Sequence, residues 1–146
     1  MQELLHIKLR NYLAVHYPGM LLSLAEEGKE EAFIREQVES ISGEMDAMLA
    51  GGAPAYEVEV ACMDILIASL PPSKYDYVLD ILEEDFPEKL SAFESSGITL
   101  YEICNIIAAC GELLEGFDEE DEAIHEAVLT VVANYFAHPE TVGHGV

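Results

Sequence analysis

TLYEICNIIAACGELL, residues 99–114, carries the clearest secondary-structure signal in this chain. Thr99 and Glu102 have the spacing of a capping box, in which a hydroxyl and a carboxylate satisfy two unpaired amides at the start of a helix. Apolar residues then recur at steps of three and four, which is the period of one helix face. They are Ile103, Ile106, Ile107, Cys110, Leu113 and Leu114. We therefore expect a helix that begins near Thr99 and ends before Gly116.

The same helical period recurs along the rest of the chain, and no pair of strands stands out. It predicts helices over residues 5–16, 34–48, 54–70, 74–86 and 124–136, with short helical turns near 20–27 and 90–93. The short connections between them favour antiparallel packing. We predict an all-α fold, a compact bundle of about six short antiparallel-packed helices. A single helical domain is expected over residues 1–138, with a flexible tail over residues 139–146.

The segment of residues 34–48 is predicted as one helix with a narrow apolar seam. The seam residues alternate steps of four and three: Ile34, Val38, Ile41, Met45 and Met48. Gly51-Gly52 is expected to end this helix. Because such a seam suits pairing between two copies, a structural homodimer is one alternative for the protein's role.

Proline and serine set the next boundaries. Pro54 fits the first turn of a helix that Pro71-Pro72 stops. Its expected buried face consists of Val58, Cys62, Ile65, Leu66 and Leu70. Ser73 then has the character of an N-cap, with Asp76 near the positive end of the following helix.

Charge limits the classes of partner. The chain has 29 Asp and Glu against 6 Lys and Arg, a formal net charge of −23, and no basic residue follows Lys89. Binding to DNA, RNA or an anionic membrane surface needs clustered Lys and Arg, so direct binding of these partners is excluded. The high apolar fraction of 51% still favours a folded domain over a disordered chain.

The acid gathers near the C-terminus, where it suggests a binding surface. The candidate residues are Glu112, Glu115, Asp118, Glu119, Glu120, Asp121, Glu122 and Glu126. A second, smaller cluster is Glu83-Glu84-Asp85. One interpretation is a solvated face that keeps the protein soluble. The other is recognition of a basic protein partner, including mimicry of DNA phosphates in the groove of a DNA-handling protein.

Two Glu-x-x-His pairs raise a metal hypothesis. Glu3 with His6, and Glu122 with His125, place both side chains on one helix face, as in the di-iron sites of helical bundles. Such pairs are expected by chance in a chain so rich in Glu, so Glu122 and His125 are weak metal candidates. His6 and His16 lie near a core face and are interpreted as structural. No cofactor is expected.

The search for a catalytic nucleophile finds none. Cys62, Cys104 and Cys110 form no CxxC motif and sit among apolar neighbours, which predicts buried free thiols and a reducing compartment. No phosphate loop or nucleophile elbow is present. The N-terminus lacks the features of a signal peptide and no apolar stretch is long enough to span a bilayer, so we expect a cytoplasmic protein that is not an enzyme.

Several short motifs together resemble a bacterial family of unknown function, the domain-of-unknown-function family numbered 1896. They are Tyr12-Leu13, His16-Tyr17-Pro18, Phe33-Ile34, the Gly51-Gly52 break, Ser73-Lys74-Tyr75-Asp76 and the segment Ile81-Leu82-Glu83-Glu84-Asp85-Phe86. The resemblance implies a small all-helical intracellular protein, often encoded near mobile elements, and it brings no catalytic residues. Where the family usually has an apolar or aromatic pair before Ser73, this chain has Pro71-Pro72.

These observations favour a non-enzymatic protein-interaction module that binds a basic partner, with a DNA-handling protein as one such partner. The alternatives are a metal-binding bundle that uses Glu122 and His125, and a homodimer with a purely structural role.

Overall fold

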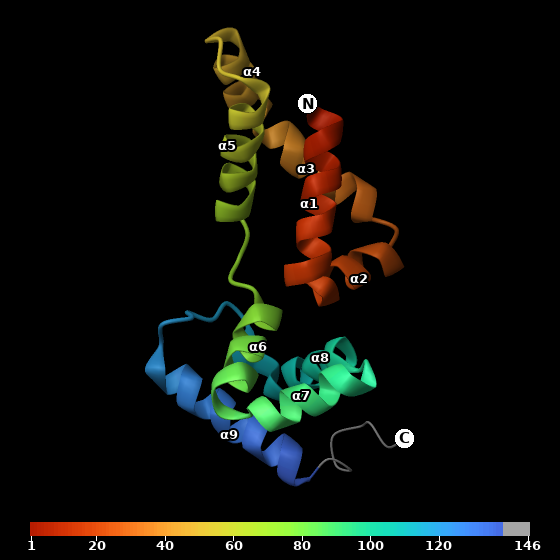
Figure 1. The fold of residues 1–146 in the computed structure, drawn as a ribbon, viewed down its shortest axis with the longest axis vertical. Coiled ribbons are helices and arrows are strands. Elements are labelled where there is room, and N and C mark those ends of the chain that lie inside the picture. The colour runs from red at the N-terminus through yellow and green to blue at the C-terminus, as the bar shows by residue number, and fades with distance from the viewer. Residues whose placement is uncertain (139–146) are drawn as a thin grey trace. The chain divides into compact units, whose positions relative to one another are not determined.

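The computed structural model describes residues 1–138, which fall into Met1–Pro71 (unit 1) and the described part of Pro72–Val146 (unit 2). Within residues 1–138 there are nine α-helices, one 3-10 helix and no strand, so the all-α class is confirmed. Each unit has its own cluster of buried apolar side chains. The predicted bundle of about six helices is therefore corrected to nine helices around two cores (Figure 1).

The helices follow one another with short connections. Unit 1 contains α1 (Gln2–His16), α2 (Pro18–Glu26), α3 (Glu30–Ser40), α4 (Ser42–Ala50) and α5 (Ala55–Ala68). Unit 2 contains α6 (Lys74–Asp85), α7 (Pro87–Ser96), α8 (Thr99–Cys110), the 3-10 helix η1 (Gly111–Leu114) and α9 (Glu122–Ala137). None of the helices in residues 1–138 has the length and apolar character needed to cross a membrane.

The core of unit 1 forms where α1 packs against α3 and α5. Leu5, Leu9 and Leu13, spaced four apart on α1, are fully buried. Ile34 of α3 and Val58 of α5 are buried against them. Periodic burial on each helix, rather than intrinsic helix propensity, therefore accounts for most of the stability of this unit.

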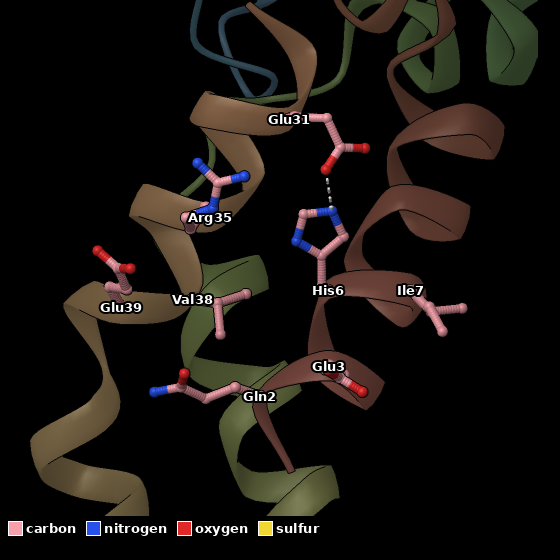
Figure 2. A pocket seen from close by; sticks show the side chains of 8 residues that line it. All are labelled: Gln2, Glu3, His6, Ile7, Glu31, Arg35, Val38 and Glu39. Carbon is pink, nitrogen blue, oxygen red and sulfur yellow. Dashed lines mark ion pairs between the residues drawn. The ribbon is translucent and has the colours of Figure 1, made fainter.

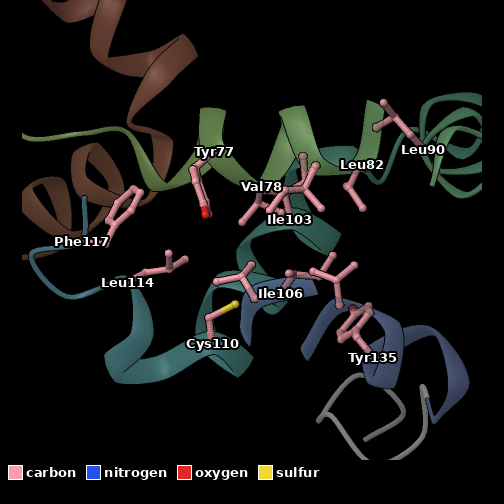
Figure 3. Packing of buried hydrophobic residues seen from close by; sticks show 13 residues of the cluster. Tyr77, Val78, Leu82, Leu90, Ile103, Ile106, Cys110, Leu114, Phe117 and Tyr135 are labelled. Atoms are coloured by element: carbon pink, nitrogen blue, oxygen red, sulfur yellow. The ribbon is translucent and has the colours of Figure 1, made fainter. Parts of the chain in front are cut away.

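The core of unit 2 is centred on α8, which packs against α6, α7 and α9. Ile103 and Ile106 of α8 are fully buried and lie close to Val78 and Leu82 of α6 (Figure 3). The predicted face of residues 103–114 is confirmed for Ile103, Ile106, Cys110 and Leu114, which are buried, while Ile107 and Leu113 are partly buried. The predicted end of this helix is wrong, because α8 ends at Cys110 and Gly111, with φ of +54°, separates it from η1.

Two aromatic–proline pairs, Tyr17-Pro18 and Phe86-Pro87, explain part of the difference between the observed and the predicted number of helices. Tyr17 and Phe86 have nearly the same backbone conformation, with φ of −136° and −137° and ψ of 49°. Pro18 and Pro87 follow them and begin α2 and α7 as the first helical residue. Proline disfavours a helical conformation in the residue before it but fits the first helical position. Each pair therefore ends one helix and begins the next.

The segment of residues 34–48 is not one helix, because the chain breaks at Ile41, whose φ is −108° and ψ is 10°. The Ser40 hydroxyl donates to the carbonyl of Gln37, and Ser40, Ser42 and Gly43 have low helix propensity. The seam residues Ile34, Val38, Ile41 and Met45 are all buried inside unit 1. This seam is therefore not a free surface for a homodimer.

Helix caps show one confirmed prediction and one wrong one. The Ser73 hydroxyl accepts a hydrogen bond from the Asp76 backbone N–H at 3.0 Å, as expected. Thr99 is the first residue of α8 and not its cap, since the capping position belongs to Ile98, which has no side-chain acceptor. The Glu102 carboxylate instead accepts a hydrogen bond from the Tyr135 hydroxyl, which links α8 to α9.

Burial on α5 also differs from the expectation at two positions. Val58, Cys62 and Leu66 are buried as predicted, whereas Ile65 is 38% exposed. Leu70 is partly buried and lies beyond the helix, which ends at Ala68. The single domain over residues 1–138 stays a prediction, and the predicted tail over residues 139–146 lies outside the described residues.

Two substitutions on α5 test this assignment of faces. Leu66→Ala removes a side chain that is 1% exposed and should lower the free energy of unfolding by about 2–5 kcal/mol. Val60→Ala, on the exposed side of the same helix, should change it by less than about 0.5 kcal/mol. Urea denaturation followed by circular dichroism gives both values, and equal losses would contradict the assignment.

Candidate functional site

The predicted acidic residues are brought together on the surface of unit 2. We call Glu112, Glu115, Asp118, Glu119, Glu120, Asp121, Glu122 and Glu126 the acidic segment. All eight are exposed, and they come from η1, the loop after it and the first turns of α9. The sequence therefore located a continuous, solvent-facing stretch of carboxylates.

Apolar anchors hold the backbone of the acidic segment in place. Leu114 is fully buried and Phe117 is 5% exposed, so the loop is fixed to the core at two points. The Phe117 ring meets the edge of the Tyr77 ring with centroids 4.9 Å apart (Figure 3). Gly116, between the two anchors, has φ of +59°, a conformation that favours glycine. The carboxylates therefore project from an ordered loop.

Two of the carboxylates have a structural role. Asp121 caps α9, since its Oδ1 accepts from the backbone N–H groups of Ala123 and Ile124 at 2.9 and 3.2 Å. Asp118 accepts from the Glu120 backbone N–H at 2.9 Å. Such bonds satisfy amides that a helix start or turn leaves unpaired. These two residues are therefore explained by local structure.

Cations neutralise little of this charge. Within residues 1–138, Glu115 is the one member of the acidic segment with an ion pair to a basic side chain, the Lys74 ammonium at 3.1 Å. Both side chains are well exposed, so this pair contributes little to stability. The acidic segment therefore presents a mostly uncompensated negative potential.

The structure gives the metal hypothesis no support at Glu122 and His125. Glu122 is exposed, while the His125 Nδ1 lies 3.5 Å from the Tyr77 hydroxyl and its ring meets Tyr77 edge-on. Across the described part of the chain, no group of three or more His, Cys, Asp or Glu side chains is placed to hold a metal ion.

A polar pocket in unit 1 was not expected from the sequence. It is open, has a volume of about 520 Å³ and lies where α1 faces α3 (Figure 2). Its lining residues are Gln2, Glu3, His6, Ile7, Glu31, Arg35, Val38 and Glu39. The first Glu-x-x-His pair, Glu3 and His6, was the one signal that pointed here.

Ion pairs account for the best-placed polar groups of this pocket. His6 Nε2 lies 3.2 Å from a Glu31 carboxylate oxygen (Figure 2). The other Glu31 oxygen pairs with Arg10. Arg10 also pairs with Glu30 at 2.7 Å. Ligand pockets are mostly apolar, whereas four of the eight residues that line this pocket carry a formal charge. We interpret the pocket as an open groove beside the ion pairs that fasten α1 to α3.

The cysteines are free thiols in the described structure, as predicted. Cys62 and Cys110 are buried, while Cys104 is partly exposed. Burial raises the pKa of all three thiols, that of Cys110 to about 11. A nucleophilic cysteine needs a lowered pKa, so the described environments do not activate these residues.

Comparison with known proteins gives one match. A family model described as "Domain of unknown function (DUF1896)" matches residues 3–132, which confirms the resemblance noted in the sequence. No curated protein and no solved structure matches the chain.

Substitution of Asp121 tests whether this residue stabilises the start of α9. Asp121→Ala is expected to lower the free energy of unfolding by about 1 kcal/mol, because two backbone N–H groups lose their acceptor. Asp121→Asn keeps an acceptor and should cost less. Urea denaturation measures both variants, and a fully stable alanine variant would show that the cap does not hold α9.

The Cys110 thiol should react slowly in the folded protein. With a pKa of about 11, roughly one thiol in a thousand is ionised at pH 8. We expect a Cys62→Ala/Cys104→Ala variant to react with Ellman's reagent at least about tenfold more slowly when folded than in urea. Equal rates would contradict the burial of this side chain.

Proposed function

Because the chain belongs to the DUF1896 family, whose function is unknown, we propose a function from the acidic segment itself. In this proposal the protein is a non-enzymatic interaction module that acts in the cytoplasm and binds a basic protein partner. The partner presents Lys and Arg side chains to the acidic segment, and a DNA-handling protein is one class that does so.

The observation that carries the proposal is a fixed row of uncompensated carboxylates. Eight exposed acids occur within fifteen residues, and one of them has a cationic partner in the described structure. Residues 72–146 contain just two basic side chains, Lys74 and Lys89. A surface of one sign attracts a partner of the opposite sign and increases the rate of their association.

The order of the loop strengthens the argument. A carboxylate on a disordered tail would lose conformational entropy when it bound, whereas Leu114 and Phe117 already fix this backbone. The Asp118 and Asp121 hydrogen bonds add to that order. Solubility alone requires charge but does not require a fixed arrangement of it, so the geometry favours recognition.

Charge removal tests the proposal without disturbing the caps. Proteins captured from a lysate of the source cell at low salt, and eluted by a salt step, supply the partner. Glu119→Gln/Glu120→Gln/Glu122→Gln should weaken its affinity about tenfold at 50 mM salt, since each rim charge contributes a fraction of a kcal/mol. Fluorescence anisotropy measures the affinity over a range of salt concentrations.

The matched control removes the same charge elsewhere in unit 2. Glu83, Glu84 and Asp85 are all exposed near the end of α6, and their neutralisation should leave the affinity nearly unchanged. Binding that does not respond to salt, or an equal loss in both triple variants, would refute recognition by the acidic segment.

A further inference from the structure

Unit 1 has an exposed apolar surface that the acidic segment does not explain. It is formed by Leu4, Ile7 and Val15 of α1 with Tyr56 and Val60 of α5, and we call these five residues the outer face. Val15, Val60 and Tyr56 are 60%, 59% and 68% exposed. Single exposed apolar residues are common, but several on two neighbouring helices mark an interaction site.

An ion pair places the two helices of the outer face side by side. Lys8 of α1 pairs with Glu59 of α5. On α1, Leu4 lies four residues before Lys8, and on α5, Tyr56 lies three residues before Glu59, so each is a surface neighbour of the pair. Leu4 of α1 and Tyr56 of α5 therefore border the same ion pair.

The pattern along α5 also indicates a missing partner. Tyr56 and Val60 lie four residues apart on α5 and are both exposed, on a different side of the helix from the buried Cys62. This is the spacing of two neighbours on one helix face. Met63, three residues beyond Val60, packs against the core of unit 1, so the outward apolar side of α5 is confined to its N-terminal half. A helix that is apolar on two sides normally packs on both.

Charge decides which partner fits. Glu57 and Asp64 lie beside Tyr56 and Val60 on α5, both are exposed, and neither has an ion pair within residues 1–138, although Glu57 accepts a hydrogen bond from the Tyr56 hydroxyl at 3.5 Å. A second copy of the chain would bring another formal charge of −23 to this surface. A partner with cations beside its apolar residues would instead meet two carboxylates that no described cation neutralises.

We propose that the outer face binds an amphipathic α-helix of a partner protein. The bound helix carries apolar side chains at steps of three and four, which lie against Tyr56 and Val60, and Lys or Arg beside them, which meet Glu57 and Asp64. This is the helix-in-groove mode of recognition. It uses residues of unit 1 alone and does not depend on the acidic segment.

A model peptide tests the proposal on the full chain. The probe is a fluorescein-labelled amphipathic helix of Leu and Lys, with a Leu and Glu helix of equal length for comparison. We expect the Lys peptide to bind and the Glu peptide not to bind, as measured by fluorescence anisotropy. Glu57→Gln/Asp64→Asn should weaken binding of the Lys peptide and reduce its dependence on salt.

Val60→Glu is the decisive variant, because it adds negative charge and would strengthen purely electrostatic binding of the Lys peptide. We expect it to weaken binding at least about tenfold through loss of the apolar contact. Leu100→Glu, at an exposed position on α8, is the matched control and should bind like the unmodified protein. Neutralisation of Glu119, Glu120 and Glu122 removes the other proposed site for cations, so it should leave the effect of Val60→Glu unchanged, which separates this binding from the proposed function.

Three outcomes would overturn the proposal. In the first, Val60→Glu binds the Lys peptide as tightly as the unmodified protein. In the second, Val60→Glu no longer weakens binding once Glu119, Glu120 and Glu122 are neutralised. In the third, sedimentation shows a dimer that Val60→Glu dissociates, which would make a second copy the occupant of the outer face.

Discussion

Repulsion between like charges is the constraint under which this protein folds. With a formal charge of −23, most pairs of helices would repel one another if their contact depended on charge. Burial of apolar side chains has to overcome this repulsion, and each unit does so with its own cluster of fully buried Leu, Ile and Val. Two of the six Lys and Arg residues link helices in unit 1, where Lys8 joins α5 to α1 and Arg10 joins α3 to α1. The charge that remains is displayed to solvent, where it is available for binding.

Most of the fold follows from the periodicity of apolar residues. The buried positions of α1 and α8 were predictable because one face of each helix repeats without interruption. The break at Ile41 was not predictable, because the apolar period continues across it. The backbone conformation there depends instead on the neighbouring Ser and Gly residues, which have low helix propensity. Thr99 and Glu102 show the same limit. Their spacing is that of a capping box, but the Glu102 carboxylate accepts a hydrogen bond from the Tyr135 hydroxyl of α9 instead. Local patterns predict which side chains are buried more reliably than where a helix begins.

The acidic segment was likewise predictable in part. Its position and exposure were predictable from charge alone, since a run of carboxylates has no route into an apolar core. The roles of its members were not. Asp118 and Asp121 bind backbone amides, and His125 lies beside Tyr77, a residue distant in sequence. The outer face was missed for another reason: apolar residues at helical spacing predict burial, and the sequence does not distinguish burial in the chain's own core from burial against a partner.

The bond between Tyr135 and Glu102 gives the α8–α9 contact an unusual response to pH. Burial, together with the hydrogen bond to Glu102, raises the pKa of the Tyr135 hydroxyl well above its ordinary value. The folded state therefore holds this proton more tightly than the unfolded state, and the resulting stability is complete below the unfolded pKa and is lost as the pH rises through the folded one. Acidification relieves the repulsion between carboxylates and leaves this donor intact. Alkaline solution leaves that repulsion in place and ionises the donor, so base, rather than acid, is the condition that weakens the contact between these two helices.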